Sequence, residues 1–405
     1  MRISTSQLYA TNVSTISRQQ TDLLHTQQQL STGNRVVSPS DDPVAAARAL
    51  EIGQSISRIA LEKDNQGTAT DSLKNLDSQL GAIGDILQYV REKAVAAGNA
   101  ALSAEDKKYI AADIREQFDA LLNLANTRGQ DGEYLFSGYK GDTQPFTGNL
   151  NDVSYQGDEG TRSLQVSNTR LMPTSISGSE LFMKIASGNG VFSTHTSSSS
   201  AVISDGSVSG PASYTNGQYG IKFTSATAYD VFDLAADPNM SGTPLASGSY
   251  TAGGAIGLPD PGNAATQQIA VSISGAPSVG DSFTVTPGSS TDMFNTLQAF
   301  VVGLESVTDS DGYGTMVSDT LNRLDGALEN VLRLRSQTGS RMIEVDSLQS
   351  IGEDLDIQYA DRLDRLVGLD YVSAISSFQQ QQTYLEAARN TFSKVSNLSL
   401  FNFIS

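Results

Sequence analysis

The sequence LSTGNRVVSPSDDPVAAA occupies residues 30–47 and contains the clearest helix-start signal of the chain. Its central part is Ser38-Pro39-Ser40-Asp41-Asp42-Pro43. An Asp at the N-cap accepts backbone N–H bonds, and Pro suits the first helical position because its φ angle is already helical. We therefore expect a helix to begin at Pro43. Asp41, Asp42 and Pro43 form its cap, where a terminal segment meets a longer helical segment.

Apolar residues downstream of Pro43 recur with helical spacing. They step by three and four from Ala45 to Ile59, shift phase near Gly67, and resume from Leu73 to Ala97. If the helix is continuous to about Gly98, it forms a rod roughly 80 Å long at 1.5 Å per residue. Each glycine inside it costs up to about 1 kcal/mol relative to Ala. Packing against other helices must therefore stabilise it.

Further helical stretches follow later in the chain. Ser103 is an N-cap signal for a helix with an apolar face from Ile110 to Ala125, which we expect to end at Gly129. Residues 294–304 predict a short helix, and a second long helical run begins near Val317 and continues towards Leu366. Because the two long runs are comparable in length, the simplest arrangement is an antiparallel bundle.

Both ends of the chain combine apolar heptads with few charges. Residues 1–32 hold three charged side chains, and residues 371–405 also hold three. Isolated amphipathic helices are marginal in water unless their apolar face is packed. We therefore expect the terminal helices to pack between subunits as well as within one. The predicted packing residues are Tyr9, Val13, Ile16, Leu23, Leu30, Tyr371, Phe378, Leu385, Phe392, Leu398, Leu400 and Phe401.

The middle of the chain has a different composition. Residues 187–290 are rich in Ser, Thr and Gly, with short apolar runs and prolines, which is typical of strands and turns. Residues 133–166 alternate around Gly-rich turns and predict β-hairpins laid along the rod.

These patterns predict an α+β multidomain fold. An antiparallel, coiled-coil-like rod of long helices carries β-hairpins and an inserted β-rich domain. The predicted inner assembly domain comprises residues 1–42 and 367–405. The rod comprises residues 43–186 and 291–366, and the β-rich outer domain comprises residues 187–290.

The composition excludes several classes of protein. The 405 residues include no cysteine, which excludes disulfide frameworks, thiolate metal sites and cysteine nucleophiles. The formal net charge of -18, without a basic stripe, argues against nucleic acid as a partner. No apolar run approaches the roughly 18 to 20 residues needed to span a bilayer. Residues 1–7 also lack the apolar region of a cleaved secretory signal.

Motifs for catalysis or metal binding are weak throughout the sequence. His25 and His195 lie far apart, with no nearby carboxylate pattern, and are interpreted as ordinary histidines. Residues 309–314 carry neither the complete spacing of a calcium loop nor that of a dinucleotide fingerprint, so a turn is favoured there. Asp41 and Asp42 fit helix capping better than paired-carboxylate hydrolysis. We predict no catalytic, cofactor-binding or metal site.

Four blocks of the sequence resemble the bacterial flagellin superfamily. They are the opening Met1–Thr5, residues 30–47, the run Tyr134–Tyr139 and the ending Leu398–Ile404. Together they lie in both terminal thirds, in the same order as in that superfamily. Within it they are most similar to the junction subunits between hook and filament. Residues 187–290 carry no recognised motif.

This resemblance implies a secreted, extracellular structural protein of the flagellum at the hook-filament junction, without enzymatic activity or a cofactor. Such proteins pass unfolded through the flagellar type III export apparatus, guided by a cytoplasmic chaperone. They assemble as a ring of copies on hook-associated protein 1 and receive flagellin above. The family's terminal helices, which match residues 1–32 and 371–405, are disordered in the free subunit and fold on assembly.

Two alternatives remain open at this stage. The chain could be flagellin itself, although its opening and closing blocks resemble the junction subunits more closely. It could also be a secreted surface module whose β-rich middle binds glycan or carries enzymatic activity, with the helices as a stalk. No group of catalytic side chains in residues 187–290 favours that second alternative.

Overall fold

The computed structural model describes residues 5–99, 101–129, 131–186, 188, 191–196, 201–204, 206–208, 217–260, 263–288, 290–306 and 313–401. The chain forms two compact units. Unit 1 comprises Met1–Asn65 and Ser347–Ser405, and unit 2 comprises Gln66–Asp346.

Helices account for most of both terminal thirds, as the periodicity predicts. Helix α2 begins at Pro43, the residue that the start signal predicts. Helix α5 begins four residues before Val317. The helices are α1 (Thr5–Thr32), α2 (Pro43–Ala97), α3 (Ala104–Ala125), α4 (Met293–Ser306), α5 (Tyr313–Val367) and α6 (Tyr371–Phe401).

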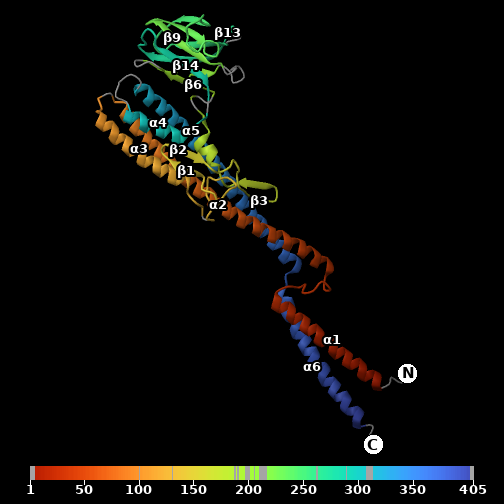
Figure 1. Ribbon diagram of the computed structural model, residues 1–405. Helices are drawn as coiled ribbons and strands as arrows, with labels where there is room; N and C mark the ends of the chain where they lie inside the picture. The colour runs from red at the N-terminus through yellow and green to blue at the C-terminus, as the bar shows by residue number, and fades with distance from the viewer. Residues whose placement is uncertain are drawn as a thin grey trace. The chain divides into compact units, whose positions relative to one another are not determined.

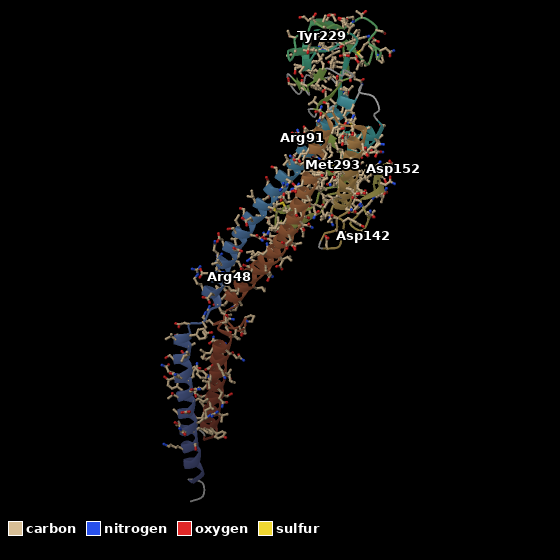
Figure 2. The ribbon with its side chains drawn as sticks, turned by 90° about the vertical axis from the view of Figure 1, so that its left-hand side faces the viewer. Arg48, Arg91, Asp142, Asp152, Tyr229 and Met293 are labelled. Atoms are coloured by element: carbon tan, nitrogen blue, oxygen red, sulfur yellow. The ribbon has the colours of Figure 1, made fainter. Side chains whose placement is uncertain are left out.

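The two long helices α2 and α5 run antiparallel. In unit 2, Arg91 of α2, labelled in Figure 2, forms an ion pair with Asp325 of α5, with 2.5 Å between Nε and Oδ1. Asp77 lies further towards the N-terminus of α2 and pairs at 3.0 Å with Arg335, further towards the C-terminus of α5. The residue numbers of these pairs fall along α2 while they rise along α5, so the two helices pack antiparallel. This confirms the predicted rod.

Helix α3 begins with a complete capping box. The Ser103 hydroxyl accepts the Asp106 N–H, and the Asp106 carboxylate accepts the Ser103 N–H. The helix ends at Ala125, four residues before the predicted end at Gly129. The physical reason is Asn126, whose side-chain amide bonds both the N–H and the C=O of Phe146 and so directs the chain into a hairpin.

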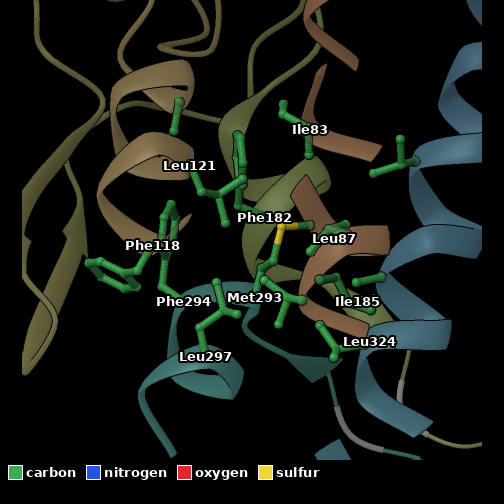
Figure 3. Close-up of a cluster of buried hydrophobic side chains, with 14 of the residues drawn as sticks. Ile83, Leu87, Phe118, Leu121, Phe182, Ile185, Met293, Phe294, Leu297 and Leu324 are labelled. Carbon is green, nitrogen blue, oxygen red and sulfur yellow. The ribbon is translucent and has the colours of Figure 1, made fainter. Parts of the chain in front are cut away.

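Aromatic rings fill the core of unit 2 where α3, α4 and the short π-helical turn η1 (Ser179–Met183) meet (Figure 3). The Phe294 ring lies 5.4 Å from that of Phe182 and 5.7 Å from that of Phe118. Phe146 lies 5.2 Å from Phe294 on a third side. These rings are fully buried, and rings that pack edge-to-face or stacked stabilise a core beyond the effect of their area alone.

Two β-hairpins follow α3. The first contacts Asn126 after α3 and Gln298 of α4, and the second contacts both long helices. Gln66 of α2 donates its side-chain N–H to the Val166 carbonyl, and Arg170 pairs with Glu344 of α5 at 2.6 Å. Tyr134 forms an isolated β-bridge with Arg128, and residues 135–139 form turns in which Phe136 is buried and its carbonyl accepts the Gly178 N–H. The paired strands are β1 (Phe146–Asn149) with β2 (Asp152–Tyr155), and β3 (Ser163–Ser167) with β4 (Arg170–Pro173).

The β-rich insertion consists of antiparallel strands in two sheets that share one core (Figure 1). One sheet has the order β11-β10-β9-β14-β6, and the other has the order β12-β13-β7, with β8 also paired to β13. Short strands β5 (Ile185–Ala186) and β15 (Ser290–Thr291) pair at its base. The remaining bounds are β6 (Phe192–Thr196), β7 (Ala201–Ile203), β8 (Ser207–Val208), β9 (Tyr219–Ser225), β10 (Ala228–Asp233), β11 (Ala246–Ser249), β12 (Ala255–Asp260), β13 (Asn263–Gly275) and β14 (Ser282–Pro287).

Candidate functional site: the terminal helix pair

Helices α1 and α6 form an antiparallel pair in unit 1 (Figure 1). Near one end, the ring of Tyr9 lies 5.1 Å from the ring of Phe392. Near the other end, Gly33 lies beside the Tyr371 side chain. Leu385 is only 7% exposed. The helices that carry the two ends of the chain are therefore partners within one subunit.

The predicted packing residues divide between a seam and an exposed face. Leu385 is buried in the seam, and Ile16, Leu23, Leu30, Phe378 and Phe392 are half-buried. Tyr9, Val13 and Tyr371 remain exposed. The structure describes the backbone of α6 up to Phe401, but the side chains of Leu398, Leu400 and Phe401 lie outside the described part of the chain.

More apolar side chains face solvent on the pair than the heptad analysis identified. Val372 is 82% exposed and Tyr384 is 59% exposed, and Leu24 and Ile375 are exposed as well. Leu24 directly follows the heptad residue Leu23, so the signal was present but one position outside the repeat. We define the exposed apolar face as Tyr9, Val13, Leu24, Tyr371, Val372, Ile375 and Tyr384.

Single exposed apolar residues are normal on soluble proteins. Seven of them on a helix pair with few charges make the pair a candidate surface for contacts with other chains. Burial of such side chains contributes roughly 1.5 to 3 kcal/mol each when they are covered completely. Other parts of unit 1 also expose apolar side chains, among them Val44, Leu50 and Ile357, so the terminal pair is one candidate contact surface of this unit.

The loop of residues 33–42 connects this pair to α2 and is held by the C-terminal end of α5 and by the loop that precedes α6. The Arg35 N–H donates to the Val367 carbonyl at 2.7 Å, and the Leu369 N–H donates to the Gly33 carbonyl at 3.0 Å. The Arg35 guanidinium also donates to the Leu366 carbonyl at 3.1 Å. Gly33 has a φ of 73°, a conformation that favours glycine. These long-range backbone bonds were not visible in the sequence pattern.

Asp42 and Asp41 have different roles in this loop. Asp42 caps α2, because its Oδ1 accepts the Ala45 N–H at 3.0 Å, and that bond, followed by the Arg35 guanidinium, lowers the pKa of its carboxyl. Asp41 accepts the N–H groups of Ser38 and Val37 at 2.8 and 3.0 Å. The Ser38 N–H, then His25, lower the pKa of the Asp41 carboxyl.

Replacing Asp42 by Ala is expected to open the first turn of α2. The Ala45 amide loses its acceptor, so its hydrogen exchange with solvent should become faster, while Asp42→Asn, which retains a capping oxygen, should stay close to the parent. The folded carboxyl has a pKa below its ordinary value of 3.8, so its contribution is complete at neutral pH and is lost as the pH falls below that value. Equal exchange rates in the two variants would contradict this role.

Both histidines have carboxylate neighbours that the sequence did not reveal. His25 Nε2 lies 3.2 Å from Asp41 Oδ1, and His195 Nδ1 lies 3.5 Å from Asp319 Oδ2. In the described residues, no group of three or more His, Asp or Glu side chains is arranged to hold a metal ion. Among the described helices, none is long and apolar enough to cross a membrane.

Comparison with known proteins connects this architecture to flagella. Residues 3–141 match the bacterial flagellin N-terminal helical region. Over 406 residues the chain is 27% identical to flagellar hook-associated protein 3 of Escherichia coli, and the match covers 99% of each chain.

The chain belongs to the bacterial flagellin superfamily.

Solved structures of this superfamily show the same architecture. The crystal structure of the flagellar junction protein FlgL from Legionella pneumophila has a TM-score of 0.65 and 29% identity; the match covers 80% of this chain and 100% of the other. The match to a flagellin of Listeria monocytogenes is shorter, at 24% identity over 40% of this chain and 55% of the relative. This member of the superfamily therefore shares its whole length with hook-associated protein 3 and only part of it with that flagellin.

Proposed function

We propose that this protein is a structural subunit of the extracellular bacterial flagellum, located at the junction between hook and filament. The observation that carries this proposal is the match to a hook-associated protein 3 over 99% of both chains. The long antiparallel rod and the exposed apolar face give that role a physical basis. An axial subunit needs a stiff body and a surface that other chains can cover.

The partners in this proposal are other proteins of the flagellar axis. We infer that copies of this chain form a ring on hook-associated protein 1, that flagellin adds above this ring, and that an export chaperone and the export apparatus handle the chain before assembly. The exposed apolar face supports contacts between copies, because its side chains gain burial only when another chain covers them.

Flagellin is the alternative function. The partial match to a flagellin favours it less than the full-length match to a junction subunit. Purified protein distinguishes the two, because flagellin polymerises into long filaments and a junction subunit stops at a short layer. Electron micrographs of concentrated protein that show long filaments would favour flagellin.

The role of the exposed apolar face in assembly can be tested with a substitution that does not disturb the fold. Tyr384→Asp is expected to reduce incorporation into flagella about tenfold or more, because covering a carboxylate with an apolar partner is costly. The melting temperature of the free chain should not change, because Tyr384 is 59% exposed. Incorporation is measured by quantitative immunoblotting of sheared flagella.

Gln382→Asp is the matched control for that variant. Gln382 is an exposed polar residue on the same helix, so the substitution adds the same charge without removing an apolar side chain. We expect this control to assemble normally. Equal incorporation of the two variants would show that Tyr384 is not part of the contact surface. A lower melting temperature for Tyr384→Asp would show that Tyr384 stabilises the free chain instead.

A further inference from the structure

Unit 2 contains a polar cavity of about 340 Å³ where the base of the β-rich insertion meets α4 and α5. Thr194 and His195 of β6 line it on the insertion side. Asp292, directly before α4, and Asp319, Asn322 and Arg323 of α5 line it on the rod side. A cavity of this volume lies at the small end of the range for ligand pockets, and such pockets often occur where two parts of a protein meet.

Thr194 is a buried polar side chain without a partner. It is 6% exposed, and among the described residues its hydroxyl has no hydrogen-bond partner. An unsatisfied buried hydroxyl costs roughly 1 to 3 kcal/mol, which is why most buried polar groups are paired. The neighbouring Ser193 hydroxyl, by contrast, bonds the Thr286 hydroxyl at 3.1 Å. The cavity therefore contains a hydrogen-bonding group that the fold itself does not use.

The cavity also carries charges of both signs. Arg323 is half-buried and has neither an ion pair nor a hydrogen bond within the described part of the chain. Asp319 lies 3.5 Å from His195, and Asp292 is buried, with its carboxylate accepting the Phe294 N–H at 2.7 Å. A free guanidinium suits a carboxylate, which it can bind with two parallel hydrogen bonds. The aspartates suit a cationic donor.

We propose that this cavity is a binding site for a small zwitterion with the chemistry of a free α-amino acid. The ligand carboxylate binds Arg323, its ammonium group binds the side where Asp319 lies, and Thr194 and Asn322 hydrogen-bond between these two ends. A ligand with only a negative charge is repelled by the two aspartates, and a ligand with only a positive charge is repelled by the guanidinium. Only a ligand with both charges satisfies both sides of the cavity. This inference goes beyond the proposed function and does not depend on it.

Isothermal titration of the full-length chain with the common L-amino acids, one at a time, tests the proposal directly. The best binder is then compared with its amide, which lacks the carboxylate charge, and with its N-acetyl derivative, which lacks the ammonium charge. We expect each single-charge analogue to bind at least about tenfold more weakly. The proposal fails if no amino acid binds at about 10 mM, or if an analogue binds as tightly as the parent.

Substitutions in the cavity test which residue binds the ligand carboxylate and which binds its ammonium group. Arg323→Gln is expected to weaken amino-acid binding about tenfold or more and to remove the preference over the amide, and Asp319→Asn should remove the preference over the N-acetyl derivative. Thr194→Val keeps the side-chain shape and should weaken binding severalfold without lowering the melting temperature, because the hydroxyl has no partner to lose.

Arg48→Gln is the control for Arg323→Gln. Arg48 is an exposed arginine of α2 in unit 1 (Figure 2) and does not line the cavity. We expect this control to bind like the parent chain. If Arg48→Gln weakens binding as much as Arg323→Gln, the ligand is not in the cavity. If all cavity variants bind normally while their far-ultraviolet circular dichroism matches the parent, the assignment is wrong.

Discussion

A chain that lacks residues 371–405 is expected to support no filament growth. The truncation removes α6 and with it Ala374 and Leu385, the apolar side chains that are buried among the described residues of α6. It also removes Tyr371, Val372, Ile375 and Tyr384 from the exposed apolar face. Helix α1 then has no partner for its apolar stripe, and an isolated helix of this composition is marginal in water. Both the seam and the contact surface are lost together.

The experiment replaces the genomic copy with the truncated gene and counts filaments by electron microscopy. Immunoblotting of the culture medium separates failed export from failed assembly, because exported but unassembled protein accumulates there. The helical signal of purified truncated protein should remain high, since unit 2 ends at Asp346 and its largest hydrophobic cluster lies within residues 76–334. Filaments of normal length on these cells would show that α6 is not needed for assembly.

Replacing Phe294 by Ala is expected to lower the free energy of unfolding of unit 2 by about 3 to 5 kcal/mol. Phe294 is 1% exposed, and its ring contacts those of Phe118, Phe146 and Phe182. Removing the ring leaves a cavity where α3, α4, the first hairpin and η1 meet, and this arrangement cannot collapse without moving several elements (Figure 3). Urea unfolding followed by circular dichroism measures the effect.

Val302→Ala is the control on the same helix. Val302 is exposed on α4, so its truncation should change the free energy of unfolding by no more than about 0.5 kcal/mol. A similar loss for both variants would mean that the effect of Phe294→Ala does not come from the aromatic cluster. A loss below about 1 kcal/mol for Phe294→Ala would show that the neighbouring rings close the cavity.

Helix positions could be predicted from the sequence because their signals are local. Pro43 starts α2 and Ser103 caps α3, since capping depends on residues within one turn of each other. The end of α3 was placed too late, at Gly129 instead of Ala125, because it is decided by bonds between Asn126 and Phe146, twenty residues away. Local chemistry starts a helix, but a distant partner can end it.

The candidate assembly surface was predicted only in part. A heptad gives the spacing of apolar residues along a helix but does not say which helix covers them. Leu385 and Tyr384 are neighbours in the sequence, yet the first is buried in the seam and the second is exposed. The role of these residues in packing between subunits stays a prediction, and the division between seam and exposed face required the partner helix.

By itself, the sequence determined the helix starts, the antiparallel long-helix rod, the inserted β-rich segment and the resemblance to the flagellin superfamily. Each of these follows from residue patterns within a short stretch or from blocks in a given order. Only the tertiary structure decided which apolar side chains remain uncovered and which polar groups meet. His195, Asp319 and Arg323 share one cavity although β6 and α5 are more than a hundred residues apart, because folding brings together groups whose separation along the chain carries no signal.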